Sequence, residues 1–121
     1  MNCITALSQV KPALPELDDV LQAAVNAAAS RIYLSARADK AIVRILANAE
    51  LQEYAVWPTP QLRQFATDLY QLAADDEFDE SIPQDATFEH HVGDIRYQLK
   101  FCSLPAYPVG FDMCTLLIVD N

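Results

Sequence analysis

Glycine is scarce in this sequence, whose 121 residues include only Gly93 and Gly110. A P-loop needs at least two closely spaced glycines followed by Lys and Ser or Thr, and a dinucleotide-binding fingerprint needs three. Neither glycine stands in such a pattern. We therefore expect that the chain holds no nucleotide phosphates through either kind of loop, and that it is not an enzyme on its own.

Basic residues are also few. Eight Lys and Arg oppose seventeen Asp and Glu, which gives a net charge of −9 and a pI near 4.4. A nucleic-acid-binding protein normally carries a basic stripe that displaces counterions from phosphates, and an anionic membrane surface attracts the same kind of patch. The charge balance therefore argues against nucleic acid and the membrane surface as direct partners.

Long apolar runs are missing. A run such as Leu116 to Val119 is far shorter than the roughly 20 residues of a membrane span. The N-terminus lacks the basic segment and apolar stretch of a signal peptide. The sequence therefore predicts a cytoplasmic protein that does not insert into a membrane.

Cysteine and histidine are too few and too scattered for a metal site. Cys3, Cys102 and Cys114 form no Cys-x-x-Cys pair, and the neighbouring His90 and His91 lie on a predicted strand, where successive side chains point to opposite faces. We expect no bound metal, a reducing compartment, and Cys102 and Cys114 as small core or half-core residues.

The first half of the chain shows two helical patterns around a strand region. Apolar residues at the helical period predict a helix from Glu16 onward, with Arg31 at its far end. Short strands follow over 32–34, 40–46 and 50–57, the last two joined by a hairpin turn at Asn48. Thr59 is expected to cap the second helix, and Pro60 suits its first position.

The second half contains a loop and three more strands. Residues 75–85 hold six acidic residues and no basic one, which predicts a solvated, mobile loop. Strands are expected over 86–91, 94–102 and 111–119, the last of them central and covered on both faces.

The element order is helix, three strands, helix, three strands. Tight hairpins favour an antiparallel sheet, so the sequence predicts an α+β domain with one curved sheet of about six strands and its helices segregated to one side. Residues 1–15 are expected to form an N-terminal arm and residues 16–121 the single domain.

The strand after Gly93 carries the best candidate site. Ile95, Tyr97, Leu99 and Phe101 alternate with Arg96, Gln98, Lys100 and Cys102, so the second set lies on a face open to solvent or a partner. Arg96 has two interpretations. It pairs across the hairpin with Glu89, or it is offered to an anion such as a phosphate held by another domain.

Several segments resemble one known family, the traffic ATPases of type II secretion, type IV pili and plasmid transfer. Leu17 to Val25 followed by Ala29-Ser30-Arg31-Ile32-Tyr33-Leu34 is similar to their opening pattern L-L-x-x-A-x-x-x-x-A-S-D-I-H-L. Val43-Arg44-Ile45 through Asn48-Ala49-Glu50-Leu51 is similar to their V-R-I-D-G-x-L hairpin. Arg31 stands at the Asp of the first pattern and Tyr33 at its His.

Three further segments extend the resemblance in the same order along the chain. Thr59-Pro60-Gln61-Leu62 is similar to the L-T-P-E start of the family's second helix. Ile95 to Leu99 is similar to the R-F-R-V-N strand, with Gln98 at its second arginine, and Thr115 to Ile118 is similar to the closing V-L-R-x-I strand.

The resemblance implies a PAS-like N-terminal domain that packs against a RecA-like ATPase core. It implies that this domain moves as a rigid body, takes part in homo-hexamer assembly, and works at the inner-membrane secretion or pilus platform through its partners. ATP and Mg²⁺ would belong to the core, with no cofactor in this chain. Arg96 would contact the nucleotide, with Lys100 and Arg44 as supporting basic residues.

The sequence leaves alternatives open. We expect an excised N-terminal domain, since the chain stops at Asp120-Asn121, where a linker to the core would begin; a stand-alone remnant is the other possibility. A PAS-like sensor would bind a small apolar ligand inside the curved sheet. An independent adaptor would bind a partner by strand addition at an exposed sheet edge.

Overall fold

The computed structural model describes residues 15–120 of the chain. Residues 1–14, most of the expected arm, lie outside the described residues, as does residue 121. The elements are α2 (Pro15–Asn26), β1 (Arg31–Ala36), β2 (Lys40–Ala47), β3 (Glu50–Pro58), α3 (Thr59–Ala74), β4 (Gln84–Val92), β5 (Ile95–Pro105) and β6 (Phe111–Asp120).

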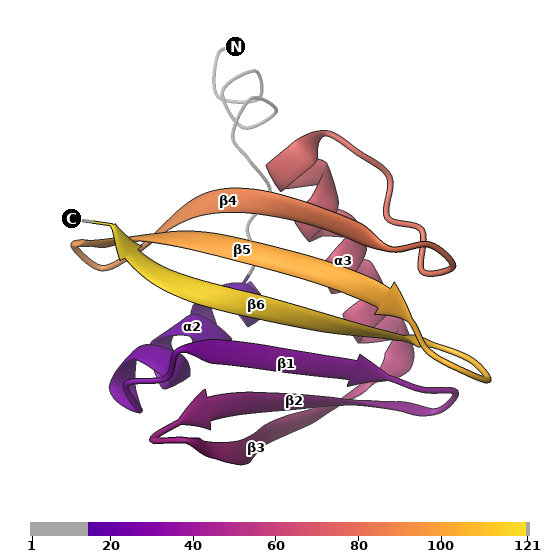
Figure 1. Ribbon diagram of the computed structural model, residues 1–121, viewed down its shortest axis with the longest axis horizontal. Helices are drawn as coiled ribbons and strands as arrows, with labels where there is room; N and C mark the ends of the chain where they lie inside the picture. Colours follow the sequence, from indigo (N-terminus) through magenta and orange to yellow (C-terminus); the bar gives the residue numbers. More distant parts are fainter. Residues whose placement is uncertain (1–14, 121) are drawn as a thin grey trace, which may run out of the picture.

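The strands form one six-stranded sheet in the order β3-β2-β1-β6-β5-β4, and every neighbouring pair is antiparallel. Each half of the chain supplies three consecutive strands, and the last strand returns to the middle to pair with both β1 and β5. Figure 1 shows the curved sheet in front and both helices behind it. The predicted α+β fold, with its order αβββαβββ, is confirmed.

The core lies between the helices and one face of the sheet. Burial alternates along β1 and β2, so every second side chain points to the helices. The helices contribute an apolar stripe each, and both stripes meet the buried sheet residues in one cluster. The largest fully buried side chains of the cluster are Tyr70, Phe101, Phe111, Leu21, Leu62, Leu69 and Leu99.

The helix α2 ends earlier than its alanine content predicts. Ala28 takes a left-handed conformation (φ 56°), and the N–H groups of Ala28 and Ala29 donate to the carbonyls of Val25 and Ala24. These are the two hydrogen bonds of a Schellman motif, which closes a helix. The expectation that Arg31 lies at the helix end is therefore wrong: Arg31 is the first residue of β1 and is exposed.

The start of α3 also differs in detail. Thr59 is buried and is the first helical residue, and Pro58 takes the N-cap position without a capping side-chain bond. The Thr59 hydroxyl donates instead to the carbonyl of Arg37 at 2.7 Å. Thr59 thus ties α3 to the residue that follows β1. The prediction that Thr59 caps its own helix is wrong.

The hairpin between β2 and β3 is confirmed. Asn48 and Ala49 both have positive φ, 54° and 61°. Two successive left-handed residues are the signature of a type I′ turn, whose twist matches the flanking strands.

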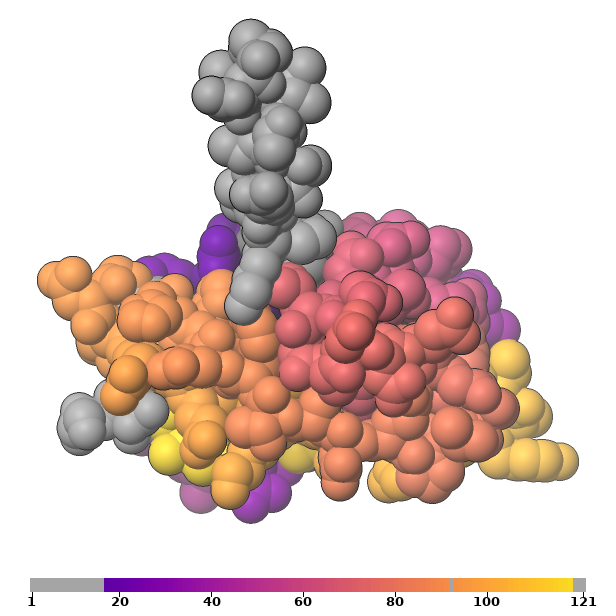
Figure 2. Space-filling model, turned by 90° about the horizontal axis from the view of Figure 1, so that it is seen from above, coloured from indigo at the N-terminus to yellow at the C-terminus, as the bar shows by residue number. Residues whose placement is uncertain are grey.

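The acidic loop between α3 and β4 is anchored to the domain. The ring of Phe78 stacks on Tyr70 and meets Phe111 edge-on. Arg63 of α3 pairs with Glu80 of the loop through its Nε at 2.5 Å. Figure 2, seen from above, shows α3 and this loop continuing the surface of β4.

The strand β6 is central, as expected, but only its inner face is covered. Phe111, Met113 and Thr115 point to the helices and are buried, whereas Leu116 and Ile118 are half-buried. Among the described residues, no element covers the second face. The expectation of a doubly covered strand is wrong, and a partly apolar sheet face is left open.

Candidate functional site

The sheet surface opposite the helices, which we call the open face, combines apolar and basic side chains. Its half-buried apolar residues lie on three neighbouring strands, β2, β1 and β6: Tyr33, Ile42, Leu46, Cys114, Leu116 and Ile118. Exposed apolar surface bordered by polar groups is typical of an interaction site. The open face is therefore the first candidate for a functional surface.

Several basic residues of the strands lie on the open face, among them Arg31, Arg44, Arg96 and Lys100. Arg31 of β1 and Lys100 of β5 are both opposite Leu116 of β6 in register, one on either side. With strands about 4.8 Å apart, their Cα atoms lie about 10 Å from one another. Side chains of this length can approach a single anion above Leu116.

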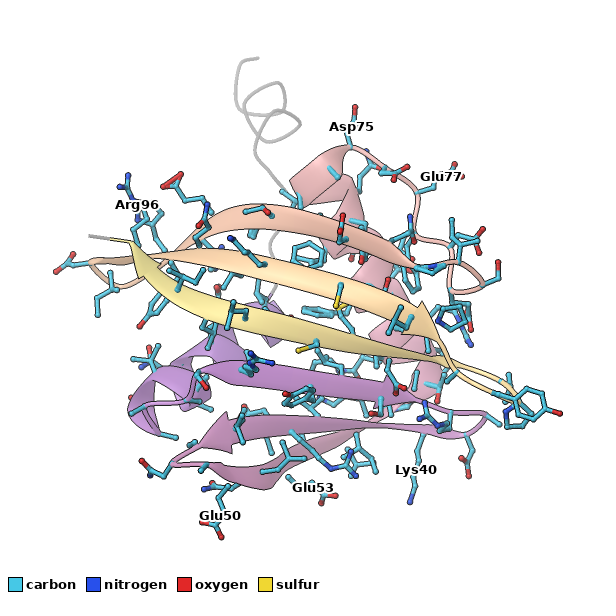
Figure 3. The ribbon with its side chains drawn as sticks, viewed as in Figure 1. Lys40, Glu50, Glu53, Asp75, Glu77 and Arg96 are labelled. Carbon is cyan, nitrogen blue, oxygen red and sulfur yellow. The ribbon has the colours of Figure 1, made fainter. Side chains whose placement is uncertain are left out.

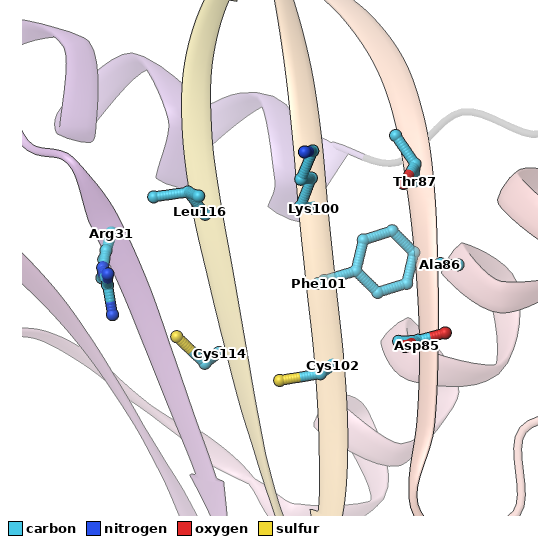
Figure 4. Close-up of a pocket in the computed structure, with 9 residues that line it drawn as sticks. All are labelled: Arg31, Asp85, Ala86, Thr87, Lys100, Phe101, Cys102, Cys114 and Leu116. Carbon is cyan, nitrogen blue, oxygen red and sulfur yellow. The ribbon is translucent and has the colours of Figure 1, made fainter.

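A hollow of about 390 Å³ lies at this point of the open face. Figure 4 shows its lining, which comes from β1, β6, β5 and β4. Arg31, Lys100 and Thr87 supply hydrogen-bond donors, and Asp85 lies at the far side. This donor set suits a small anionic group such as a phosphate or a carboxylate.

A second hollow, of about 320 Å³, adjoins the first on the same face. It is lined by Tyr33 and by the ion pair of Arg37 and Asp112, whose Nη1 and Oδ1 atoms lie 3.0 Å apart. Cys102 and Cys114 line both hollows. The two thiols thus stand at the border between them.

Arg31, Tyr33 and Cys114 interact with one another. Hydrogen bonding to Tyr33 raises the pKa of Arg31. Burial raises the pKa of the Cys114 thiol and the nearby Cys102 adds to this, whereas Arg31 and Tyr33 act in the opposite direction. At neutral pH Cys114 is a protonated thiol beside a guanidinium.

The predicted site residues share the open face but do not form one cluster. Arg96 lies four residues from Lys100, about 13 Å along β5, at the end of the strand near the β4–β5 turn (Figure 3). Its Nε is 3.0 Å from Glu89 Oε1, so the expected cross-hairpin pair forms. Arg44 is on β2, opposite Tyr33. Lys100 alone of the three lines the first hollow.

Sequence reasoning missed Arg31 and the two cysteines as site residues. Cys114 is half-buried, in keeping with the expected half-core position, whereas Cys102 is exposed on the open face and not in the core as expected. The sequence did indicate the open face for Cys102, because Cys102 shares the alternate strand positions of Arg96 and Lys100 in β5. No such indication exists for Cys114, because β6 is apolar on both faces at its end.

The two histidines lie on opposite faces of β4. His90 is half-buried, stacks on Phe88 and lies with its Nε2 2.7 Å from Asp18 Oδ1 of α2, while His91 is exposed on the other face. Within residues 15–120, no three His, Cys, Asp or Glu side chains lie close enough together to hold a metal ion.

The interior of the domain is filled. Between the two helices and the sheet, the space lined by Leu17, Phe65 and Leu99 amounts to about 10 Å³. Ligand pockets typically hold 300–1,000 Å³. The described core therefore weighs against a sensor that binds a small apolar ligand inside the sheet.

Comparison with known proteins decides the family. Residues 6–115 match the sequence profile described as type II/IV secretion system protein. The chain belongs to this family. The predicted resemblance is thereby confirmed, and it points to the N-terminal domain of the secretion ATPases.

A solved structure, the Legionella pneumophila ATPase DotB, has a similar fold. The superposition has a TM-score of 0.67 at 12% sequence identity and covers 90% of this chain. The chain corresponds to only 30% of the DotB chain. No curated protein matches the chain. None of the helices described is both long and apolar enough to cross a membrane.

Proposed function

We propose that this chain is the non-catalytic N-terminal domain of a type II/IV secretion ATPase, moving against a RecA-like core and taking part in hexamer assembly. The observation that carries the proposal is the family match over residues 6–115, in a chain whose two glycines form no phosphate-binding loop. ATP and Mg²⁺ are bound by the core. The domain works in the cytoplasm at the inner-membrane platform of a secretion, pilus or plasmid-transfer system.

The open face is the surface that we assign to the core. Within residues 15–120 both helices lie on the opposite face, which leaves the open face of the sheet accessible to a partner (Figure 1). Its half-buried Tyr33, Leu46 and Leu116 would lose their remaining contact with water on docking, which is favourable at about 25 cal/mol per Å². A rigid domain held in this way transmits motion of the core without internal rearrangement.

Arg96 is the residue that we assign to the nucleotide. Its ion pair with Glu89 is exposed on both sides, and exposed pairs contribute only about 0–1 kcal/mol. A γ-phosphate offers a stronger, charge-assisted partner. Exchange of Glu89 for phosphate would bias the domain toward the ATP-bound position, with Lys100 and Arg44 adding to the positive potential of the face.

Two measurements test this function. The purified 121-residue chain should release no phosphate from ATP, and turnover that follows the chain through every purification step would refute the proposal. In the complete ATPase, Arg96→Ala should lower ATP hydrolysis at least about tenfold, since arginine contacts to a transferred phosphate are worth more than this.

The matched control is Glu89→Gln, which removes the same ion pair and keeps the cation. It should retain hydrolysis, and both variants should melt within a few degrees of the parent because the pair is exposed. Equal turnover of Arg96→Ala and the parent would remove Arg96 from the mechanism.

The β3 edge supports a second candidate function, a protein adaptor. Leu51, Tyr54 and Val56 are exposed on this edge strand, and an extended peptide could pair with it. A bulge in the β2–β3 pairing interrupts the edge near Tyr54. Loss of a co-purifying partner in Val56→Lys, with retention in the open-face variant Arg44→Gln, would favour the adaptor.

A further inference from the structure

Cys102 and Cys114 form a cross-strand pair. They are directly opposite in the register of β5 and β6, on the open face. Figure 4 shows the sulfur of Cys102 on the side of β6 and the sulfur of Cys114 turned toward β1 and Arg31. Cys102 is exposed and Cys114 half-buried, so an oxidant in solution can reach the first thiol and the second lies next to it.

The hydrogen-bond pattern shows which kind of pair this is. The N–H of Leu117 in β6 donates to the carbonyl of Ser30, just before β1. Because bonded and non-bonded pairs alternate along an antiparallel ladder, the backbone of Cys114 bonds to β5 and not to β1. Cys102 and Cys114 are therefore a hydrogen-bonded pair, with Cα atoms about 5.5 Å apart.

That Cα separation falls within the range of about 4.4–6.8 Å found for disulfides. The Cβ atoms of such pairs lie about 5 Å apart, somewhat beyond the mean of about 3.8 Å in a disulfide. A bond at this register is accessible with a rotation of Cys114 about χ1 and a small approach of the strands. It would be reduced more easily than a relaxed structural disulfide.

We propose that Cys102 and Cys114 form a reversible cross-strand disulfide that responds to the thiol–disulfide balance of the compartment. Glutathione disulfide is the oxidant. The Cys102 thiolate attacks it, forms a mixed disulfide and releases one glutathione thiolate. Cys114 then loses its proton, attacks the Cys102 sulfur and releases the second glutathione. Two thiols are oxidised and one glutathione disulfide is reduced to two glutathione molecules, which take up the two protons that the cysteines lose.

The disulfide changes the two hollows that the cysteines border. Bridging turns the Cys114 sulfur away from Arg31 and toward β5, so Arg31 loses its neighbour at the floor of the first hollow. In a reducing compartment such bonds are transient and redox-sensing. The pair is thus a switch on the open face, and it does not depend on the proposed ATPase function.

The experiment is a titration of the chain in glutathione buffers of rising oxidised fraction. All proteins carry Cys3→Ser, which removes the third thiol of the chain. The Cys102–Cys114 chain should lose two hydrogens in intact mass and both reactive thiols, yield one linked peptide in a non-reducing digest, and recover fully with dithiothreitol. The matched controls Cys102→Ser and Cys114→Ser should form only a glutathione adduct.

Two results would overturn the proposal. One is a chain that carries glutathione on Cys102 while Cys114 stays a free thiol under the same buffers. The other is oxidation into disulfide-linked dimers at every protein concentration tested, with no intrachain peptide.

The role of Arg31 has its own readout, the rate at which the mixed disulfide closes. A cation beside a thiol favours the thiolate that attacks, so Arg31→Gln should slow closure severalfold. Lys40→Gln removes a cation of β2 that lines neither hollow, and it should leave the rate unchanged. Equal rates for the two variants would refute a part for Arg31.

Discussion

The two glycines offer a sharp test of the backbone geometry, because one is sterically required and the other is not. Gly110 precedes β6 with φ +104°, and a β-carbon there would overlap the carbonyl oxygen of Ala36 and lie 2.9 Å from its carbonyl carbon. Gly93, in the β4–β5 turn, has φ +60° and no atom within 4 Å of the same position. Gly110→Ala and Gly93→Ala are therefore a matched pair.

The expected losses follow from these contacts. In both variants the left-handed conformation costs alanine about 1–2 kcal/mol, partly offset by about 0.4–1 kcal/mol from the stiffer unfolded chain. Gly93→Ala should therefore lose about 1 kcal/mol. In Gly110→Ala the end of β1 must also move, and forced shifts in a packed region cost about 1–3 kcal/mol more, so its loss should reach about 3–4 kcal/mol.

A shift of the Ala36 carbonyl in Gly110→Ala would also disturb two neighbouring hydrogen bonds. The Ala36 carbonyl accepts a hydrogen bond from Arg37 Nη1 at 2.9 Å, and the Arg37 carbonyl accepts one from the Thr59 hydroxyl. Urea unfolding followed by circular dichroism measures both variants. With a slope of about 1.5 kcal/mol/M, the midpoint should fall by about 0.7 M for Gly93→Ala and by 2 M or more for Gly110→Ala. Equal midpoints would refute the steric reasoning.

Three further predictions concern stability. Ala28 and Ala49 have a left-handed backbone conformation, which is strained for alanine. Changing either to Gly should therefore raise the free energy of unfolding by about 0.5–1 kcal/mol in urea titrations. A decrease would show that these positions are not strained. Burial raises the pKa of Tyr70, so the folded state favours its neutral form, and stability should be full below about pH 10 and fall as pH rises toward the raised pKa. Tyr70→Phe removes two hydrogen bonds and should lower the free energy of unfolding by about 1–2 kcal/mol at neutral pH. Its stability should then fall less steeply with rising pH than that of the parent. Equal pH slopes would show that Tyr70 does not cause the alkaline loss. Glu80→Gln breaks the half-exposed pair with Arg63 and should cost no more than about 1 kcal/mol, less in high salt; a loss above about 2 kcal/mol would contradict this.

The faces of the strands could be predicted from the sequence where polar and apolar residues alternate. The pattern of β5 placed Arg96 and Lys100 on the open face, and the alternating burial along the strand confirms it. In β6 the alternation fails after Thr115, where apolar residues occupy both faces. The sequence of β6 therefore does not show which face Cys114 occupies. The pairing of β6 with β1 and β5 places it on the open face.

The ends of the helices were harder to predict, since tertiary contacts overrode local preference. Alanine favours continuation of α2, yet Ala28 ends it, because the chain must turn for Arg31 to pair with Leu46 and Leu116. Thr59 looks like an N-cap in sequence, but its hydroxyl reaches a carbonyl 22 residues away. Neither partner is visible in a local pattern.

Two of the departures from the family pattern, at Arg31 and Tyr33, lie together in space. Arg31 stands where the traffic ATPase pattern has Asp, and Tyr33 where it has His, and both interact with Cys114. An aspartate at the first position would oppose a thiolate on β6 through like charge, whereas Arg31 favours it. The substitution of a cation for an anion is thus chemically matched to the cysteine that faces it. We infer that Arg31, Tyr33 and Cys114 act as one local group on the open face.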